Sequence, residues 1–373
     1  MNLVERLTEF SSRFSGRQKA IAGGVAVVLV AGGAIGGTIA LTSGGGDDTV
    51  AVISSPPVTS ASPTPTPTPK PKPKPKPKPK AKLVNPLTGI GAPPKGPVIG
   101  VKIDDTGNGR PQRGIDRADI VYIEQAEGGL TRLLAVFATH KPIVEAVRSV
   151  RASDPELLSQ YGPIALVASG GGGDSLPTLH KSILHGVIND AGGPGFSRDG
   201  GRGAPYNLTS NLSQVSRAIH SGGSKDIGFE WKAKPGLGAK PKASRVRTVV
   251  GGTPVTFDWS PKRGRYVRVI DGSQQHAASG ALISTPNVIV QYCSVSVNRG
   301  DVDVTGNPSQ YTHSVGHGRV AVFRNGHRIE GSWSRLAKST GTKLLDKHHK
   351  PITLAPGGAW VVLVTNGAPL STS

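Results

Sequence analysis

The 373-residue sequence has only one cysteine, Cys293, and this limits its covalent chemistry. A single cysteine cannot form an internal disulfide, and no cysteine follows the apolar segment near the N-terminus, where a lipid would be attached. Cys293 lies in the apolar run 287–293, which is typical of a buried, unreactive thiol. The sequence therefore excludes a disulfide-stapled fold and a cysteine-linked lipid anchor.

Acidic and aromatic residues are also scarce. The chain has 24 Asp and Glu against 44 Lys and Arg, a net charge of +20, and only 5% of its residues are aromatic. Residues 1–82 carry a net charge of +7, so the remaining +13 belongs to residues 83–373. Without a nucleic-acid motif, and with few rings for base stacking, we expect no nucleic-acid partner. Outside a membrane the abundant polyanions are wall polymers and anionic lipid headgroups.

Several motifs of catalysis and metal binding are missing. The sequence has no G-x-S-x-G elbow, and its scattered Ser, His and Asp residues nominate no triad. His348 and His349 have no partners at metal-ligand spacing, and the Gly-rich run 169–175 lacks the lysine of a P-loop. We expect that run to be a flexible turn before a helix, with anion binding by its N–H groups as the alternative. The sequence predicts no cofactor and no metal site.

The N-terminal 82 residues indicate a membrane anchor and a spacer. A basic leader, 1–19, precedes 23 uncharged and mostly apolar residues, 20–42, enough for a transmembrane helix. The basic leader predicts a cytoplasmic N-terminus, with residues 43–373 outside the cell membrane. A cleaved signal peptide is the alternative. Small residues at 32/36 and 33/37 would allow the helices of two copies to pair, so a dimer is an open option.

The linker, 43–82, contains alternating Pro-Thr and Pro-Lys repeats over 63–82. Such repeats adopt an extended polyproline conformation of about 3.1 Å per residue, so residues 56–82 would reach roughly 80 Å. That length suits a domain that must cross part of a cell wall. A plain solubilising tether is the alternative.

The remaining sequence predicts two domains of different character. Residues 83–231 alternate between strand and helix signals, which indicates an α/β domain. The expected strands are 98–103, 119–123, 131–137 and 164–168, and the expected helices are 154–161, 176–190 and 211–220.

A Gly/Lys/Pro-rich segment, 232–244, is predicted to be a hinge before a mostly antiparallel β-rich (α+β) domain, 245–373. Its expected strands are 253–259, 265–270, 287–292, 319–324, 328–333 and 359–364, with a hairpin at Asn325-Gly326. The four tryptophans all lie at or beyond residue 231. We expect them to anchor the core, with a sugar-stacking face as the alternative.

Charged residues stand at the ends of the apolar runs in the first domain. In open α/β sheets, ligands bind outside the carboxyl ends of strands, so these residues predict a crevice. Carboxylates there could do acid/base work, and arginines could hold a carboxylate or phosphate in bidentate fashion. Strand-end ion pairs that only fix loops are the alternative. The catalytic candidates are Asp104, Glu124 and Glu127. Further charged candidates are Asp105, Arg110, Arg132, Arg148 and Arg151, with Arg198 and Arg202 on a loop that could cover the crevice.

An ordered series of motifs resembles the bacterial DUF3048 family, also called the YerB-like lipoproteins. The series comprises 85–89 (NPLTG), 101–105 (VKIDD), 110–112 (RPQ), 118–122 (ADIVY), 127–132 (EGGLTR), 147–151 (VRSVR) and 196–199 (FSRD). The resemblance covers about residues 85–365 and includes a separate C-terminal family domain.

The resemblance implies an extracytoplasmic, membrane-tethered protein of unknown function. The positions that it matches are Asp104, Arg110, Gln112, Asp119, Glu127, Thr131, Arg132, Arg148, Arg151, Arg198, Arg202 and Asn207. This chain departs from the family where Ala168 and Tyr206 replace histidines and where the lipid-bearing cysteine is absent. A mechanism that needs either imidazole is therefore not expected here.

Three hypotheses for function follow. The first is a non-catalytic envelope protein that binds an anionic wall component or an envelope partner through the Arg/Asp/Glu crevice. The second is a wall-acting hydrolase or transferase that uses the acidic residues. The third is a TonB-like transducer, which also combines one span with Pro-Lys repeats, although this span has no polar relay residue. The sequence identifies neither ligand nor reaction.

Overall fold

A computed structural model of the protein describes residues 84–234, 240–303 and 305–373, which belong to one compact unit. The predicted leader, transmembrane helix and linker lie outside the described residues. Among the residues that are described, none of the helices has both the length and the apolar character needed to cross a bilayer.

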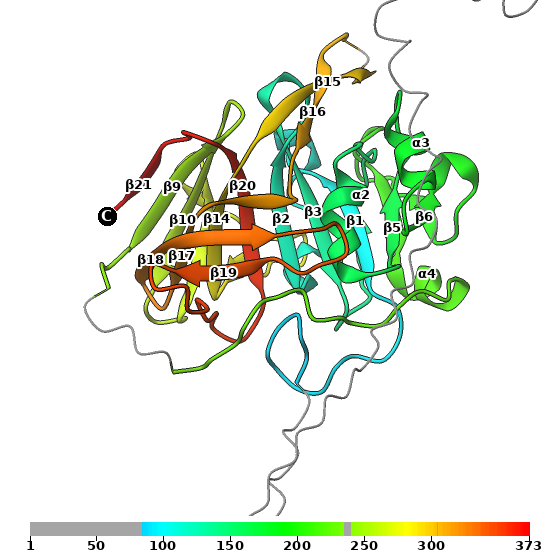
Figure 1. The fold of residues 1–373 in the computed structure, drawn as a ribbon. Helices are drawn as coiled ribbons and strands as arrows, with labels where there is room; N and C mark the ends of the chain where they lie inside the picture. The colour runs from blue at the N-terminus through cyan, green and yellow to red at the C-terminus, as the bar shows by residue number, and fades with distance from the viewer. Residues whose placement is uncertain (1–83, 235–239, 304) are drawn as a thin grey trace, which may run out of the picture. The chain divides into compact units, whose positions relative to one another are not determined.

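The main element is a mixed ten-stranded sheet in the order β19-β18-β17-β14-β20-β2-β3-β1-β5-β6 (Figure 1). Its strands are β1 (Ile99–Asp104), β2 (Ile120–Gln125), β3 (Thr131–Phe137), β5 (Ala165–Ala168), β6 (His185–Ile188), β14 (Asn287–Cys293), β17 (Gly316–Arg324), β18 (His327–Arg335), β19 (Lys343–Asp346) and β20 (Ala359–Thr365). Both β1 and β2 are antiparallel to β3, while β5 is parallel to β1 and β20 is parallel to β2. The carboxyl ends of β1, β2, β5 and β20 therefore lie at one end of the sheet, where β3 begins.

A second sheet, in the order β12-β11-β10-β9-β21, packs on one face of the first. It contains β9 (Arg245–Val250), β10 (Thr253–Ser260), β11 (Arg265–Ile270), β12 (Ser273–Gln274) and β21 (Leu370–Thr372), and β13 (Ser284–Thr285) pairs with β11.

Two smaller sheets and short helices complete the fold. The small sheets are β15 (Val295–Val302) with β16 (Pro308–Thr312), and β4 (Ile143–Glu145) with β8 (Leu208–Asn211) and β7 (Phe196–Arg198). The α-helices are α2 (Asp154–Leu158), α3 (Ser175–His180) and α4 (Leu212–Ala218). The 3₁₀ helices are η1 (Gly107–Gly109), η2 (Ile115–Arg117), η3 (Glu127–Gly129), η4 (Ser159–Tyr161) and η5 (Asn189–Ala191).

The two faces of the ten-stranded sheet carry two separate cores. Because strand side chains alternate, Val101 and Ile103 pack toward the second sheet, while Tyr122 and Leu134 pack toward α2. Burial on both faces explains why these strands are nearly continuous apolar runs.

Most predicted elements are confirmed, but one helix is wrong. The expected helix at 176–190 ends at His180, and β6 follows it. The β-branched Val187 and Ile188 bury against the sheet, and Gly186 lies where an added Cβ would approach Leu179 at 3.0 Å. The predicted hairpin is confirmed: Arg324 pairs with His327, and Asn325 and Gly326 both have positive φ. The chain is thus mostly β and less helical than the sequence suggests.

The two predicted halves share one sheet. Strand β20, from the C-terminal half, lies between β14 and β2, which come from different halves. The domain boundaries at 232–244 stay a prediction, and residues 235–239 lie outside the described part of the chain. No hinge between independent sheets is needed to describe the rest.

A buried ion pair ties the two sheets together. Arg268 of β11 donates to both carboxylate oxygens of Asp105, at 2.8 and 2.6 Å, and its guanidinium lies 5.3 Å from the ring centroid of Trp360. Both charged side chains are at most 3% exposed. An Arg–carboxylate fork this enclosed joins the end of β1 to the second sheet.

Removal of Arg268 should destabilise the protein strongly. In Arg268→Ala, Asp105 would stay buried without its partner, which costs about 3–5 kcal/mol of unfolding free energy. Urea denaturation measures the loss. Arg245→Ala is the matched control, because Arg245 makes the same two-bond fork with Asp258 at the surface, both at 2.7 Å, and should leave the midpoint nearly unchanged. Equal losses in the two variants would contradict this assignment.

Candidate functional site

Some of the predicted charged residues converge at the carboxyl ends of β1 and β2. The register places Asp104 opposite Arg132, and Arg132 opposite Glu124, in one row across β1, β3 and β2 (Figure 1). Residues opposite one another in a sheet project from the same face, so all three side chains point toward the α2 side. The expected gathering of charge therefore has a structural basis, although its members have separate roles.

Asp104 lies at the centre of this site and is fully buried. Its Oδ1 accepts hydrogen bonds from the N–H and hydroxyl of Thr106, at 2.7 and 2.5 Å. Its Oδ2 lies 3.0 Å from Arg148 Nε and 3.6 Å from Arg132 Nη2, but it accepts no well-aligned hydrogen bond from the described residues. The contact of this oxygen with the two arginines is therefore one of charge, without an aligned hydrogen bond.

The loop after β1 closes tightly over Asp104. A Cβ on Gly109 would lie 2.6 Å from Asp104 Oδ1, so glycine is required for this approach. Arg110 bonds back to its own turn, and Arg202 donates to the carbonyls of Gly109 and Pro111 at 3.0 and 2.5 Å. These two predicted ligand-binding arginines thus hold the loop in place.

Glu127 pairs with Arg151 beside this centre. Arg151 donates to both carboxylate oxygens, and its Nη2 lies 2.8 Å from Oε2. Burial acts to raise the pKa of Glu127, but the hydrogen bonds and charge of Arg151 outweigh it and lower the pKa. Glu127 is therefore held ionised, as part of an ion pair.

Glu124 points into a sealed cluster. Lys102 of β1 donates to Glu124 and, at 2.7 Å, to Asp154 of α2, and all three side chains are at most 2% exposed. Burial first, and the nearby Asp154 second, raise the pKa of Glu124 to about 8, while Lys102 opposes the shift. A raised pKa is typical of catalytic carboxyls. Here it belongs to a group enclosed beneath the sheet and paired with lysine.

Arg148 is the member of the centre that reaches solvent. Its side chain is 23% exposed, and its guanidinium lies over the ring of Tyr206, 5.3 Å from the centroid. Burial lowers the pKa of Arg148, Asp104 opposes that shift, and the charge of Arg132 adds to it. On the same β7–β8 hairpin as Tyr206, Arg198 donates to the side chain of Asn207 at 2.9 Å, at the surface.

Other predicted binding residues lie elsewhere and have structural contacts. Thr131 and Gln112 both donate to Asp105, at 2.7 and 3.4 Å, and so belong to the Asp105–Arg268 clamp. Asp119 accepts two backbone N–H groups after β3, those of residues 138 and 139. Because Asp105 follows Asp104 directly, it points to the opposite face, and the adjacent pair does not form one crevice.

The Gly-rich run 169–175 packs against the β15–β16 hairpin. Asp174 N–H donates to the carbonyl of Gly300 at 3.1 Å, and Ser175 donates to Asp301 at 2.5 Å. A Cβ on Gly173 would collide with the carbonyl of Gly300. The glycines therefore permit close backbone contact, which is a different role from the flexible turn or anion site considered from the sequence.

Sequence reasoning missed Lys102, Asp154 and Arg268. Lys102 and Arg268 each interrupt an apolar strand, between valine or isoleucine neighbours. A single cation in an apolar strand must pair with a buried acidic group. The sequence therefore already indicated that Lys102 and Arg268 have buried partners. Asp154 carried no comparable signal, because its role depends on how α2 packs.

Replacement of Glu124 by glutamine tests the sealed cluster. The pKa of Glu124 is about 8 in the folded protein against the usual 4.5, so the folded state binds an extra proton between these values. Its contribution to stability is present at pH 4.5 and is lost as pH rises to 8. Glu124→Gln cannot titrate, so its stability relative to wild type should rise between pH 5 and pH 8, by about 3 kcal/mol.

Urea denaturation at both pH values measures this difference. Glu230→Gln, at an exposed glutamate, is the control and should keep the wild-type pH dependence. If Glu124→Gln also keeps it, Glu124 does not titrate in this range.

The comparisons with known proteins agree with this architecture. Residues 87–225 and 245–361 match the N-terminal and C-terminal domains of a family described as "Protein of unknown function (DUF3048)". The chain is 27% identical over 300 residues to the Bacillus subtilis (strain 168) protein described as "Putative lipoprotein YerB", covering 76% of this chain and 86% of that protein. The crystal structure of YerB protein from Bacillus subtilis has the same fold, with a TM-score of 0.65 and 21% identity, covering 78% of this chain and 100% of that chain. The chain belongs to the DUF3048 family.

Proposed function

We propose that this protein is a membrane-tethered, extracytoplasmic envelope protein that binds an anionic envelope component through Arg148 and Arg132. In this proposal residues 20–42 are the anchor, residues 43–82 are the spacer, and the folded unit is a binding module. The bound group is a carboxylate or phosphate of a wall polymer or of an envelope partner.

One observation carries the proposal: three arginines share two carboxylates at the carboxyl ends of β1 and β2. Within 4 Å, Arg148 and Arg132 both approach Asp104, and Arg151 pairs with Glu127. The charges of Arg132 and Arg151 both act against the charged form of Arg148. An incoming anion would relieve this repulsion and supply a second partner for the exposed part of Arg148.

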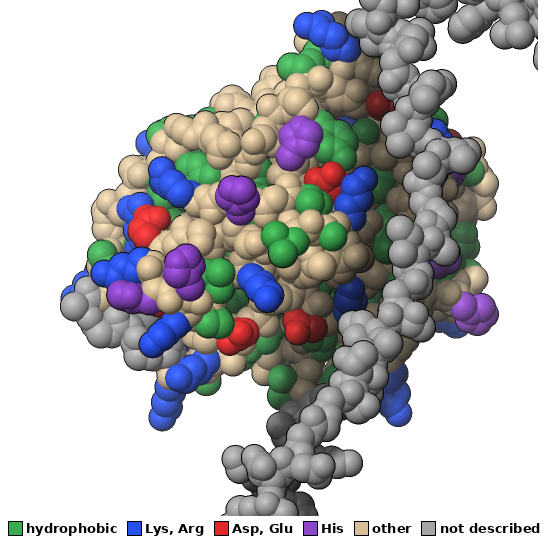
Figure 2. Space-filling view, in the orientation of Figure 1, with side chains coloured by type: hydrophobic (Ala, Val, Ile, Leu, Met, Phe, Trp, Pro, Cys, Tyr) green, Lys and Arg blue, Asp and Glu red, His purple; other side chains and the backbone are tan. Residues whose placement is uncertain are grey.

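The surface charge is compatible with a polyanionic partner. Figure 2 shows Lys, Arg and His side chains spread over the face formed by β17–β19, with fewer acidic side chains among them. The turn after β19 presents four exposed basic side chains in a row, Lys347, His348, His349 and Lys350. A positive surface raises the encounter rate with polyanions and makes it salt-dependent.

The anchoring part of the proposal rests on the sequence and on one relative. The relative in Bacillus subtilis is described as a lipoprotein. This chain has no cysteine before residue 293, so we assign the same tethering role to the uncharged segment 20–42.

Arg148→Ala should weaken binding to purified cell wall. We expect at least a tenfold loss in affinity in a low-salt pull-down, because the exposed cation of the site is removed, and we expect high salt to abolish wild-type binding. Arg217→Ala, an exposed arginine of α4, is the control and should bind as wild type. Equal binding by both variants would exclude Arg148 as the contact.

Intact protoplasts test the anchor. Protease added outside should degrade residues 43–373. In untreated cells the intact chain should be found in the membrane fraction, and a chain without residues 1–42 should be absent from that fraction. Protection of the folded unit from external protease would contradict the proposed topology.

A further inference from the structure

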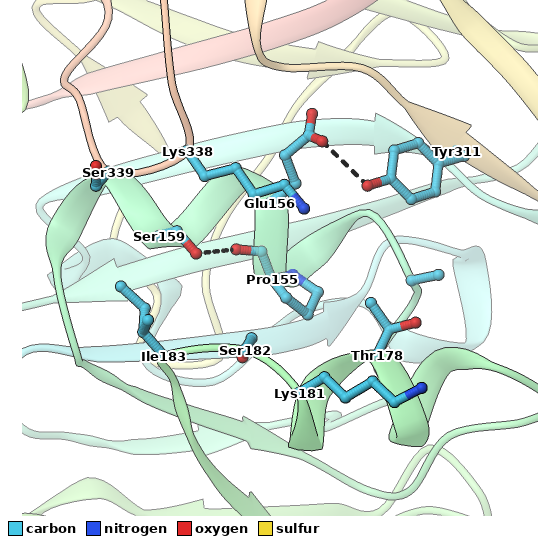
Figure 3. Close-up of a pocket in the computed structure, with 11 residues that line it drawn as sticks. Pro155, Glu156, Ser159, Thr178, Lys181, Ser182, Ile183, Tyr311, Lys338 and Ser339 are labelled. Atoms are coloured by element: carbon cyan, nitrogen blue, oxygen red, sulfur yellow. Dashed lines mark hydrogen bonds between the residues drawn. The ribbon is translucent and has the colours of Figure 1, made fainter. Parts of the chain in front are cut away.

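A pocket of about 360 Å³ lies on the α2 side of the fold and shares no residue with the Asp104–Arg148 centre. Residues in or next to α2, α3, β16 and the turn after β18 line it (Figure 3). Its walls include Ala152, Pro155, Lys181, Ile183, Tyr311 and Lys338. The first four come from the part matched by the N-terminal family domain, and the last two from the C-terminal one. A ligand here would contact both parts of the chain.

The acidic wall of this pocket is already saturated. Glu156 accepts the N–H groups of Ser314 and Val315 at 2.8 and 3.2 Å through Oε1, and the hydroxyl of Tyr311 at 3.1 Å through Oε2. Figure 3 shows its carboxylate directed at Tyr311. Counting the Ser314 hydroxyl, four donors of the protein itself already occupy the carboxylate oxygens of Glu156.

A buried arginine fixes the opposite wall. Arg335 is 1% exposed and donates to the carbonyls of Glu156 and Lys338 at 2.6 and 2.5 Å, and to that of Thr340 at 3.1 Å. Arg335 therefore links α2 to the turn that contains Lys338. A pocket whose walls are held in this way is pre-formed, which lowers the entropy cost of binding.

The groups that remain available to a ligand are cationic and apolar. Lys181 and Lys338 have no carboxylate within 4 Å among the described residues, and both line the pocket. Apolar lining comes from Ala152, just before α2, from Pro155 of α2 and from Ile183, which is 49% exposed. A pocket lined by two lysines and by apolar side chains suits a ligand that has a charged end and an apolar body.

We infer that this pocket binds a small organic anion, a carboxylate or phosphate ester, with its charge on Lys181 and Lys338 and its body on Ala152, Pro155 and Ile183. The inference does not depend on the proposed role of Arg148, because the two sites have no residue in common.

Phenyl phosphate and benzoate are suitable probes for calorimetric titration of the full chain in a non-ionic detergent. Inorganic phosphate is a control that has the negative charge but no apolar group. Benzyl alcohol is a control that has the aromatic ring but no charge. We expect at least one organic anion to bind with a dissociation constant below about 1 mM, and both partial probes to bind at least tenfold more weakly. The tighter of the two anions decides between phosphate ester and carboxylate.

Variants then locate the binding. The double variant Lys181→Gln/Lys338→Gln should weaken binding at least tenfold, and Ile183→Glu, at an exposed position, should abolish it by repulsion. Lys347→Gln is the matched control, at an exposed lysine outside the pocket, and should bind as wild type. The inference is overturned if no probe binds up to about 10 mM, if inorganic phosphate binds as well as the organic anions, or if the pocket variants bind as wild type.

Discussion

The ladder between β2 and β20 is the interaction on which the rest of the structure depends. It pairs Ile120 with Ala359 and Ile123 with Val362, so a late strand completes a sheet begun near residue 99. On its other side β20 pairs with β14. Without β20 the ten-stranded sheet would separate into two parts, and apolar faces that are now buried would meet water.

This assembly also decides what happens to the charges at the carboxyl ends of the strands. Burying a charge is costly unless it gains a partner, and here each partner comes from another segment. Lys102 reaches α2 through Asp154, and Asp105 reaches the second sheet through Arg268. Most of the acidic residues are thereby used to hold the fold. In the centre around Asp104, Arg148 stays partly exposed to solvent.

The fold thus carries two distinct cationic features. One is the arginine centre at the end of β1 and β2, and the other is the pocket beside α2 with its two lysines. Both are held by buried arginine or carboxylate groups whose hydrogen bonds are nearly all made within the protein. In a family of unknown function, this division is compatible with the proposed binding of anions.

The sequence by itself determined most of the local elements, the family and the gathering of charged residues at the strand ends. Alternating or continuous apolar runs predict strands, Asn325-Gly326 predicts its hairpin, and strand ends carry the charges. Only the tertiary structure decided that β20 lies beside β2, that 185–188 is a strand, and that Glu124 and Asp105 face buried cations on opposite faces. The physical reason is that strand pairing and ion pairing join residues far apart in the chain. Their free energy comes from burial and register, which no local pattern encodes.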